Sequence, residues 1–200
     1  EKSRTLTGHL GIGCSEPIGN QRASYLISDF RRHINHHCQS LFISNSALIC
    51  QKLVDYELDL ALIEGKTLHP ELISTQFSQD EMCVICSPDS PLANKQRFSV
   101  GDLEESEWIL REPGSGSREF FLRAIAPRIE QWHESFQLNN PKALINSVSA
   151  GIGLGCLSKL QSQPSSNHRS RVETPPYLAM QQRTSHIRTQ QQSTNTSSLK

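Results

Sequence analysis

The chain has 200 residues, of which 36% are hydrophobic, a share that supports a packed core rather than a disordered chain. Lys and Arg together number 20, as do Asp and Glu, so the net charge of zero excludes a chain that holds a nucleic-acid backbone by charge alone. Since no apolar run approaches the ~20 residues of a membrane span, we expect no contact with a membrane.

The first half of the chain alternates between buried strands and amphipathic helices. A helix follows a turn at 15–19, and its apolar residues recur at helical spacing as far as Ile34. A second helix begins near Asn45 and Ser46, which are both good capping residues. This β-α-β-α-β order predicts a parallel sheet covered by helices. The strands are expected at 9–15, 40–44 and 58–65.

The next part of the chain predicts a second lobe of similar size. Two strand candidates, "LISTQF" and "EMCVICS", are separated by only a short link. The alternation of strands and helices then resumes, so we expect two α/β lobes, joined near 77–81 and again after Ser158. The expected helices lie at 100–106, 117–132 and 141–151, and the expected strands at 107–111, 135–138 and 154–158.

The composition changes after Lys159. Gln, Ser, Thr and Asn dominate the remaining residues, and only "VETPPYLAM" retains some apolar content. Polar segments of this kind rarely bury enough apolar surface to become ordered. We therefore expect disorder in much of the tail.

The six cysteines lie inside apolar runs rather than in loops, unlike the disulfide framework of a small secreted protein. We therefore expect a reducing, cytoplasmic location. Cys83 and Cys86 form a CxxC pattern, but on a strand this spacing points the two side chains to opposite faces. The pattern predicts two buried thiols rather than a zinc or redox site, and we expect neither a cofactor nor a metal.

The stretch "WILREPGSGSREFF" sets an apolar strand against a small-residue corner that opens into a helix. Its glycines match neither a Walker loop nor a G-x-S-x-G elbow. What remains is a corner with free backbone N–H groups, the hydroxyls of Ser115 and Ser117, and a guanidinium from Arg111 or Arg118. The corner predicts an anion or polar-ligand site, or equally a serine that only caps the helix.

Two other corners share this chemistry, "GCSEPIGN" and "ISNSAL". Each ends at the carboxyl edge of a parallel strand, where open α/β sheets bind ligands. If the lobes close on each other, the three corners share one cleft, which favours a ligand site over simple capping.

Other motifs give weaker signals. "AGIGLG" does not have the spacing of a dinucleotide-binding fingerprint. His33, His36 and His37 have the spacing of a helical metal site, but without a carboxylate or thiolate partner they are more typical of a solvated face. No pair of acids is placed for acid–base catalysis, so we predict no catalytic residue.

In this order, five stretches between about Gly8 and Ser158 resemble the effector-binding region of LysR-type transcriptional regulators. These stretches are "GHLGIGCSEPIGN", "SNSALICQKLVDYELDLALIEG", "FSQDEMCVICSPDSPLA", "WILREPGSGSRE" and "ALINSVSAGIGLGCLS". The resemblance implies two lobes of the periplasmic-binding-protein type II kind, crossed twice by the chain, with a small effector in the cleft. It also implies that the full-length protein forms homodimers, and it leaves open whether these pair into tetramers.

The resemblance further implies how the chain is divided. Residues 1–7 would end a linker, 8–78 and 160–200 would form lobe I, and 79–159 would form lobe II. The two lobes would make one effector-binding domain. DNA would be bound only by an N-terminal winged helix-turn-helix that this chain does not include. The helices around 23–34 and 120–132 are our candidate dimer surfaces.

Carried over by position, Ser15, Ser46 and Ser117 match the hydroxyl-bearing residues of the family's effector pocket. Pro17 departs from the pattern, since Thr is frequent there. We predict a small, anionic metabolite as effector, and alternatives are a solute-binding module for transport and an enzyme that uses the same cleft. The residues predicted to bind the ligand are Ser15, Glu16, Pro17, Ile18, Asn45, Ser46, Glu64, Arg111, Ser115, Gly116 and Ser117.

Overall fold

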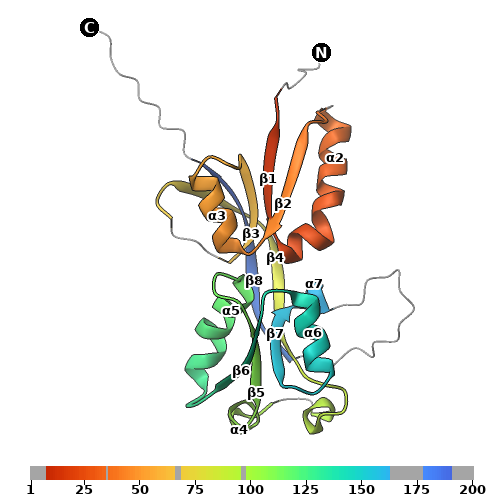
Figure 1. Cartoon of the computed structure of the whole chain (residues 1–200), viewed down its shortest axis with the longest axis vertical. Coiled ribbons are helices and arrows are strands. Elements are labelled where there is room, and N and C mark those ends of the chain that lie inside the picture. The colour runs from red at the N-terminus through yellow and green to blue at the C-terminus, as the bar shows by residue number, and fades with distance from the viewer. Residues whose placement is uncertain (1–7, 35, 66–68, 96–97, 163–177, 191–200) are drawn as a thin grey trace.

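The computed structural model describes residues 8–34, 36–65, 69–95, 98–162 and 178–190. Within them, eight strands form one sheet in the order β2-β1-β3-β8-β4-β7-β5-β6. Figure 1 shows that the sheet is divided into an upper and a lower lobe, which the strands β4 and β8 connect. The predicted linker end at 1–7 and the tail segments 163–177 and 191–200 lie outside the described residues.

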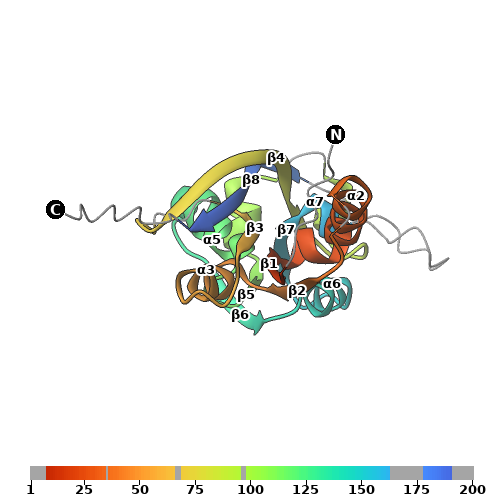
Figure 2. The same cartoon turned by 90° about the horizontal axis from the view of Figure 1, so that it is seen from above.

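The first lobe contains the β-α-β-α-β unit that the sequence predicts. Its central strand β1 pairs in parallel with both β2 and β3. Figure 2 places the helices α2 and α3 on opposite sides of these strands. The elements are β1 (Leu10–Ser15), α1 (Glu16–Ile18), the π-helical turn η1 (Gly19–Ala23), α2 (Ser24–Ile34), β2 (Gln39–Ser44), α3 (Ser46–Val54) and β3 (Leu60–Glu64).

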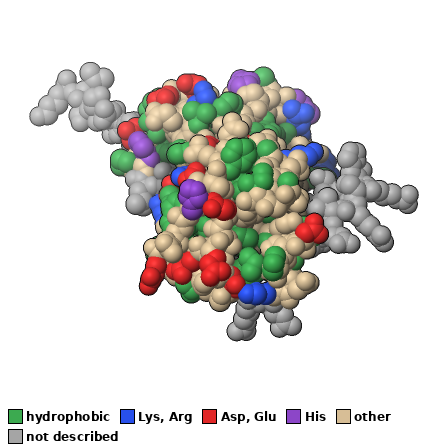
Figure 3. Space-filling view, turned by 60° about the horizontal axis from the view of Figure 1, so that its bottom comes forward, with side chains coloured by type: hydrophobic (Ala, Val, Ile, Leu, Met, Phe, Trp, Pro, Cys, Tyr) green, Lys and Arg blue, Asp and Glu red, His purple; other side chains and the backbone are tan. Residues whose placement is uncertain are grey.

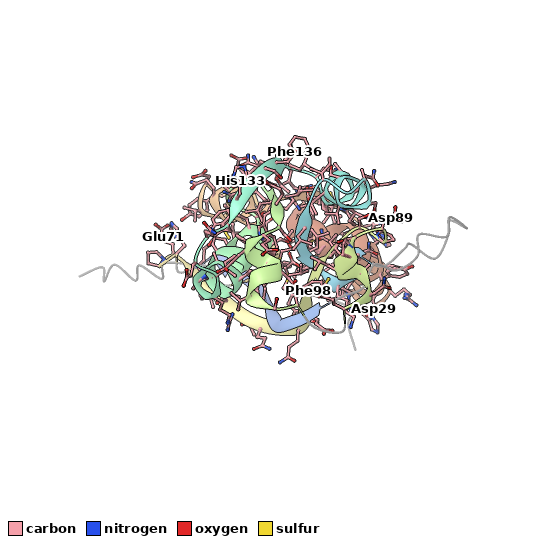
Figure 4. The ribbon with its side chains drawn as sticks, turned by 90° about the horizontal axis from the view of Figure 1, so that it is seen from below. Asp29, Glu71, Asp89, Phe98, His133 and Phe136 are labelled. Atoms are coloured by element: carbon pink, nitrogen blue, oxygen red, sulfur yellow. The ribbon has the colours of Figure 1, made fainter. Side chains whose placement is uncertain are left out.

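The second lobe repeats this design around β5, which pairs in parallel with β6 and β7. β6 lies at the edge of the sheet, and Figure 4 labels its residues His133 and Phe136. The elements are η2 (Pro91–Asn94), α4 (Val100–Glu104), β5 (Glu107–Arg111), α5 (Gly116–Phe120), η3 (Phe121–Ile125), η4 (Ala126–Arg128), β6 (His133–Leu138), α6 (Pro141–Ser149), β7 (Leu154–Ser158) and α7 (Lys159–Ser162).

Two long strands run through both lobes. β4 (Leu72–Ile85) pairs antiparallel with β8 (Leu178–Gln190) along most of its length. This corrects the prediction of two strands with a link, because the polar segment between them continues the strand. It also corrects the prediction of disorder for 178–190, because backbone pairing to β3 and β4 requires no apolar side chains. The fold is the two-lobed α/β arrangement of the periplasmic-binding-protein type II kind.

Each lobe has apolar clusters on both faces of its sheet. In the second lobe, Met82 and Val84 pack with Trp108 and Phe121 on one face, while Cys83 packs with α6 on the other. Cys86 joins the first of these clusters, so the two thiols of the CxxC pattern do point to opposite faces. Burial raises the pKa of the Cys83 thiol to about 11. Both cysteines are buried and free, as predicted.

Two predicted helices differ in the structure. The helix expected at 117–132 ends at Arg128, after a π-helical and a 3-10 turn, and Pro127 at its end lacks the N–H needed to continue an α-helix. The helix α2 ends at Ile34, before His36 and His37, so the histidine spacing does not form one helical face. His36 is buried and contacts the Gly8 carbonyl at 2.8 Å, so the prediction of a solvated face is wrong for this residue. His33 and His37 are exposed, as predicted.

The side of the surface drawn in Figure 3 does not show the cluster of positive charge that is typical of a nucleic-acid binder. Lys and Arg are scattered on this side, and Asp and Glu gather along its lower edge. Within the described ranges, no helix is both long and apolar enough to span a membrane.

Candidate functional site

The three predicted corners meet at one small cavity between the lobes. They follow β1 and β2 in the first lobe and β5 in the second, because the carboxyl ends of these parallel strands face the same gap. Of the predicted residues, only Ile18 is absent from the lining, and it packs in the core of the first lobe instead. The lining consists of Ser15, Glu16, Pro17, Ser44, Asn45, Ser46, Glu64, Arg111, Ser115, Gly116 and Ser117.

The corner after β1 holds a hydroxyl without a hydrogen-bond partner. Ser15 precedes α1 in the capping position, but its side chain makes no capping hydrogen bond. The residue is 2% exposed, and Ser15 Oγ has no partner within the described residues. A buried hydroxyl without a partner costs free energy. Ser15 therefore lines the cavity as an unused donor and acceptor, and Pro17 sits in the first turn of α1, where its missing N–H is tolerated.

The corner after β2 is held by its own side chains. Asn45 caps α3, since its Oδ1 accepts from the Leu48 N–H at 3.0 Å. Its Nδ2 donates across the cleft to Glu112 Oε1 at 3.2 Å. Ser46 Oγ donates to the Glu64 carbonyl at 3.4 Å, which ties the start of α3 to the end of β3. Asn45 is thus both a cap and a contact between the lobes.

Both serines of the corner after β5 line the cavity, and one of them also caps the following helix. Ser115 caps α5, because its Oγ accepts from the Arg118 N–H at 3.2 Å. Ser117 is buried in the cavity lining. Arg118 points to Glu134, with two hydrogen bonds of 2.9 and 2.8 Å, and its Nη1 also donates to the Arg111 carbonyl. Of the two candidate arginines, only Arg111 reaches the cavity.

Arg111 is the positive charge of the cavity, and carboxylates surround it. Its side chain is 3% exposed. The Nε donates to Glu112 Oε2 at 2.8 Å and the Nη2 to Glu112 Oε1 at 3.0 Å. The Nη2 also lies 2.9 Å from Glu16 Oε2, in the other lobe. Burial raises the pKa of Glu16, Arg111 lowers it, and Glu112 raises it again.

The cleft is closed by contacts between the two lobes. Besides the Glu16–Arg111 ion pair and the Asn45–Glu112 hydrogen bond, the Ala47 N–H donates to the Gly114 carbonyl at 3.2 Å. The cavity that remains has a volume of about 10 Å³, which is room for about one water molecule. A larger ligand therefore requires the lobes or a lining side chain to move.

Two site residues were missed from the sequence. Ser44 pairs with Ser15 in register at the end of β2, so the rule that selected Ser15 could have found it. Glu112 follows β5 directly, but no sequence pattern shows that it turns back onto the neighbouring Arg111. No group of three or more His, Cys, Asp or Glu that could hold a metal occurs in the described part of the chain.

Comparisons with known proteins agree with this architecture. The family profile of the LysR substrate binding domain matches residues 3–199. An uncharacterized HTH-type transcriptional regulator, YeiE of Escherichia coli K12, is 31% identical over 174 residues. That match covers 86% of this chain and 59% of YeiE, so the chain spans about three fifths of the length of this relative.

Solved structures of low sequence identity share the fold. The effector binding domain of QuiR in complex with shikimate matches with a TM-score of 0.79 at 17% identity, covering 93% of this chain and 88% of QuiR. The Synechocystis PCC6803 CcmR regulatory domain in complex with 2-PG matches with a TM-score of 0.74 at 19% identity, covering 97% of this chain and 91% of that domain.

Proposed function

Because this chain belongs to the LysR substrate binding domain family, we propose that it is the effector-binding part of a DNA-binding transcriptional regulator. The observation that carries the proposal is the convergence of polar side chains from three corners, around Arg111, in a cavity between two lobes. The similarity to the regulator YeiE supports the regulatory role. It gives no support to the alternative of a transport module.

The proposed effector is a small anionic metabolite. The Arg111 guanidinium would bind its anionic group, and the Ser15 hydroxyl, which lacks a partner, would donate to it. Ser44, Ser46 and Ser117 add further hydroxyls to the lining, which suits a ligand rich in oxygen atoms. Shikimate, which is bound in the QuiR domain, is a carboxylate of this kind.

The effector would act on the relation between the lobes. A ligand shifts an equilibrium only by binding one state better than the other. Here the lining comes from both lobes, so a ligand that contacts Ser15 and Arg111 together is bound fully only when the two lobes are close. The position of the lobes would then be transmitted through the assembled protein to its DNA-binding domains.

We propose that the domain forms homodimers through α2, with a tetramer of the full-length protein as the alternative assembly. α2 buries none of its residues, and Tyr25 and Leu26 are 79% and 42% exposed. The other candidate surface offers less, because Phe121 and Ile125 are buried in their own lobe. Because the chain has a net charge of zero, we assign DNA binding to another domain of the regulator. We propose that such a regulator works in the cytoplasm.

We retain lobe I as 8–78 and 160–200, and lobe II as 79–159, as the proposed division of the effector-binding domain. We also propose that the chain has no catalytic role. In the described residues, the groups around Arg111 form ion pairs and caps, and no nucleophile is paired there with a general base.

Calorimetric titration with a panel of small carboxylates and oxyanions tests the proposed function. We expect at least one of these compounds to bind the wild-type domain. The combined replacement of Ser15, Ser46 and Ser117 by Ala should lower the affinity for that compound about tenfold or more. Ser74→Ala, on an exposed part of β4, is the matched control and should leave binding unchanged. The proposal fails if no member of a broad panel binds, or if the triple replacement has no effect.

A further inference from the structure

The anion site already contains an anion that belongs to the chain itself. The Glu16 carboxylate reaches from the first lobe to the Arg111 guanidinium of the second, with 2.9 Å between Glu16 Oε2 and Arg111 Nη2. Glu112 occupies the Nε side of the same guanidinium. The remaining volume of about 10 Å³ leaves no room for a further carboxylate beside them.

Of the two carboxylates, Glu16 is the one that can leave. Glu112 makes two hydrogen bonds to Arg111 and accepts a third from Asn45, so three contacts hold it. Within the described residues, the Glu16 side chain has one contact of this kind, the 2.9 Å approach of its Oε2 to Arg111 Nη2. Glu16 is the first residue of the helical segment that continues through η1 and α2, so a change in its side-chain torsions can move the carboxylate away from Arg111 without moving the backbone.

The groups around Glu16 disfavour a charged carboxylate in the cavity. Arg111 faces it from the end of β5, but so does Glu112, and Glu64 from the end of β3 lines the same cavity. Burial and Glu112 together raise the pKa of Glu16 despite the arginine. A raised pKa means that the environment disfavours the charged form of a carboxyl group. The Glu16 carboxylate is therefore held in the cleft at an electrostatic cost.

We propose that Glu16 competes with the anionic effector for Arg111, so that effector binding is an exchange in which the effector's anionic group takes the place of the Glu16 carboxylate. This inference rests on the proposed function above and adds a specificity-determining residue to it. Because the Glu16 carboxylate is present at a high effective concentration, an anion can displace it only if the anion makes further contacts with the site. Ser15 Oγ supplies one, because it is buried next to Glu16 in the chain and has no partner in the part of the chain that the structure describes.

The exchange makes binding depend on pH with a definite sign. Protonated Glu16 no longer competes for the guanidinium, so the affinity for an anion rises as the pH falls through the titration of Glu16. Because the pKa of Glu16 is raised, this rise begins at a higher pH than for an ordinary glutamate. Glu64 and Glu112 also face the site. The contribution of Glu16 to the pH dependence of binding is therefore the contribution that Glu16→Gln removes.

The experiment compares the wild-type protein with three variants in calorimetric titrations, with sulfate and with shikimate as probes. Glu16→Gln removes the competing charge and keeps the side chain's size, and Glu16→Ala removes the side chain. Glu71→Gln is the matched control, because it makes the same change of charge at an exposed residue that Figure 4 shows at the periphery. Thermal unfolding of each variant checks that it folds.

We expect Glu16→Gln and Glu16→Ala to bind at least one probe on the order of tenfold more tightly than wild type. The Glu71→Gln protein should bind like wild type, and Glu16→Gln should flatten the rise in affinity at low pH. If wild type binds a probe and neither Glu16 variant binds it more tightly, the exchange is wrong and the proposed function stands. If no protein binds either probe, the exchange is wrong, and the titrations with the broad panel decide the proposed function separately.

Discussion

The corner after β1 and the corner after β5 have similar sequences and opposite local chemistry. Both place a serine between a parallel strand and a helix. Ser115 Oγ accepts a hydrogen bond from a backbone N–H and caps its helix, whereas Ser15 Oγ is buried and has no partner among the described residues. The presence of a serine at such a corner therefore does not decide whether it caps the helix or is free to bind a ligand. What decides is whether a backbone N–H lies within reach of its hydroxyl.

The largest effect in this comparison is expected at Gly114, which turns the corner after β5. Its φ of +89° is unfavourable for a residue with a side chain, and an added Cβ would lie 2.7 Å from the Cβ of Ala47. We expect Gly114→Ala to lower the free energy of unfolding by about 2 kcal/mol or more, measured by urea denaturation.

Gly151→Ala separates the two causes. Gly151 also has a positive φ, +81°, but an added Cβ there meets no atom within 4 Å. We expect this control to cost about 1 kcal/mol, from the backbone alone. Equal losses in the two variants would show that the close approach of Gly114 to Ala47 is not important for the closed cleft.

A smaller effect tests the capping role of Ser115. Ser115→Ala removes the acceptor for the Arg118 N–H, and we expect a loss of about 1 kcal/mol in the free energy of unfolding. Ser115→Asp, which keeps a capping oxygen, should restore most of it. A Ser115→Ala protein as stable as wild type would contradict the capping role.

The same replacement at the corner after β1 should behave differently. Ser15→Ala removes a buried hydroxyl that has no partner within the described ranges, so we expect the free energy of unfolding to stay within about 0.5 kcal/mol of wild type or to increase. Both serine variants belong in one denaturation series under identical conditions. A large loss of stability in Ser15→Ala would show that its hydroxyl has a structural partner after all.

The reactivity of Cys14 reports on how often the corner after β1 opens. Cys14, directly before Ser15, is fully buried, and burial raises the pKa of its thiol to about 12. Since only the thiolate reacts, iodoacetamide at pH 8 should modify the exposed Cys38 on the order of a hundredfold faster, as followed by peptide mass spectrometry. Comparable rates would mean that this corner opens readily in the free protein.

The elements that were predicted well are those whose pattern is local. The apolar strand with Trp108 and the helix that begins with Pro141 carry their own periodicity and caps, and both lie as predicted. β8 could not be foreseen in the same way, since partner strands rather than its composition hold it in the sheet. The polar centre of β4 was not predicted as strand for the same reason, since its pairing with β8 holds it in the sheet.

The sequence by itself determined that three small, polar corners follow parallel strands, and that Ser15, Ser46 and Ser117 lie on them. Spacing and residue type contain this information. Only the tertiary structure decided which hydroxyl is used, and that Glu16 reaches Arg111 from the other lobe. The reason is physical: a capping bond depends on geometry within one turn, but an ion pair across a cleft depends on how two lobes approach.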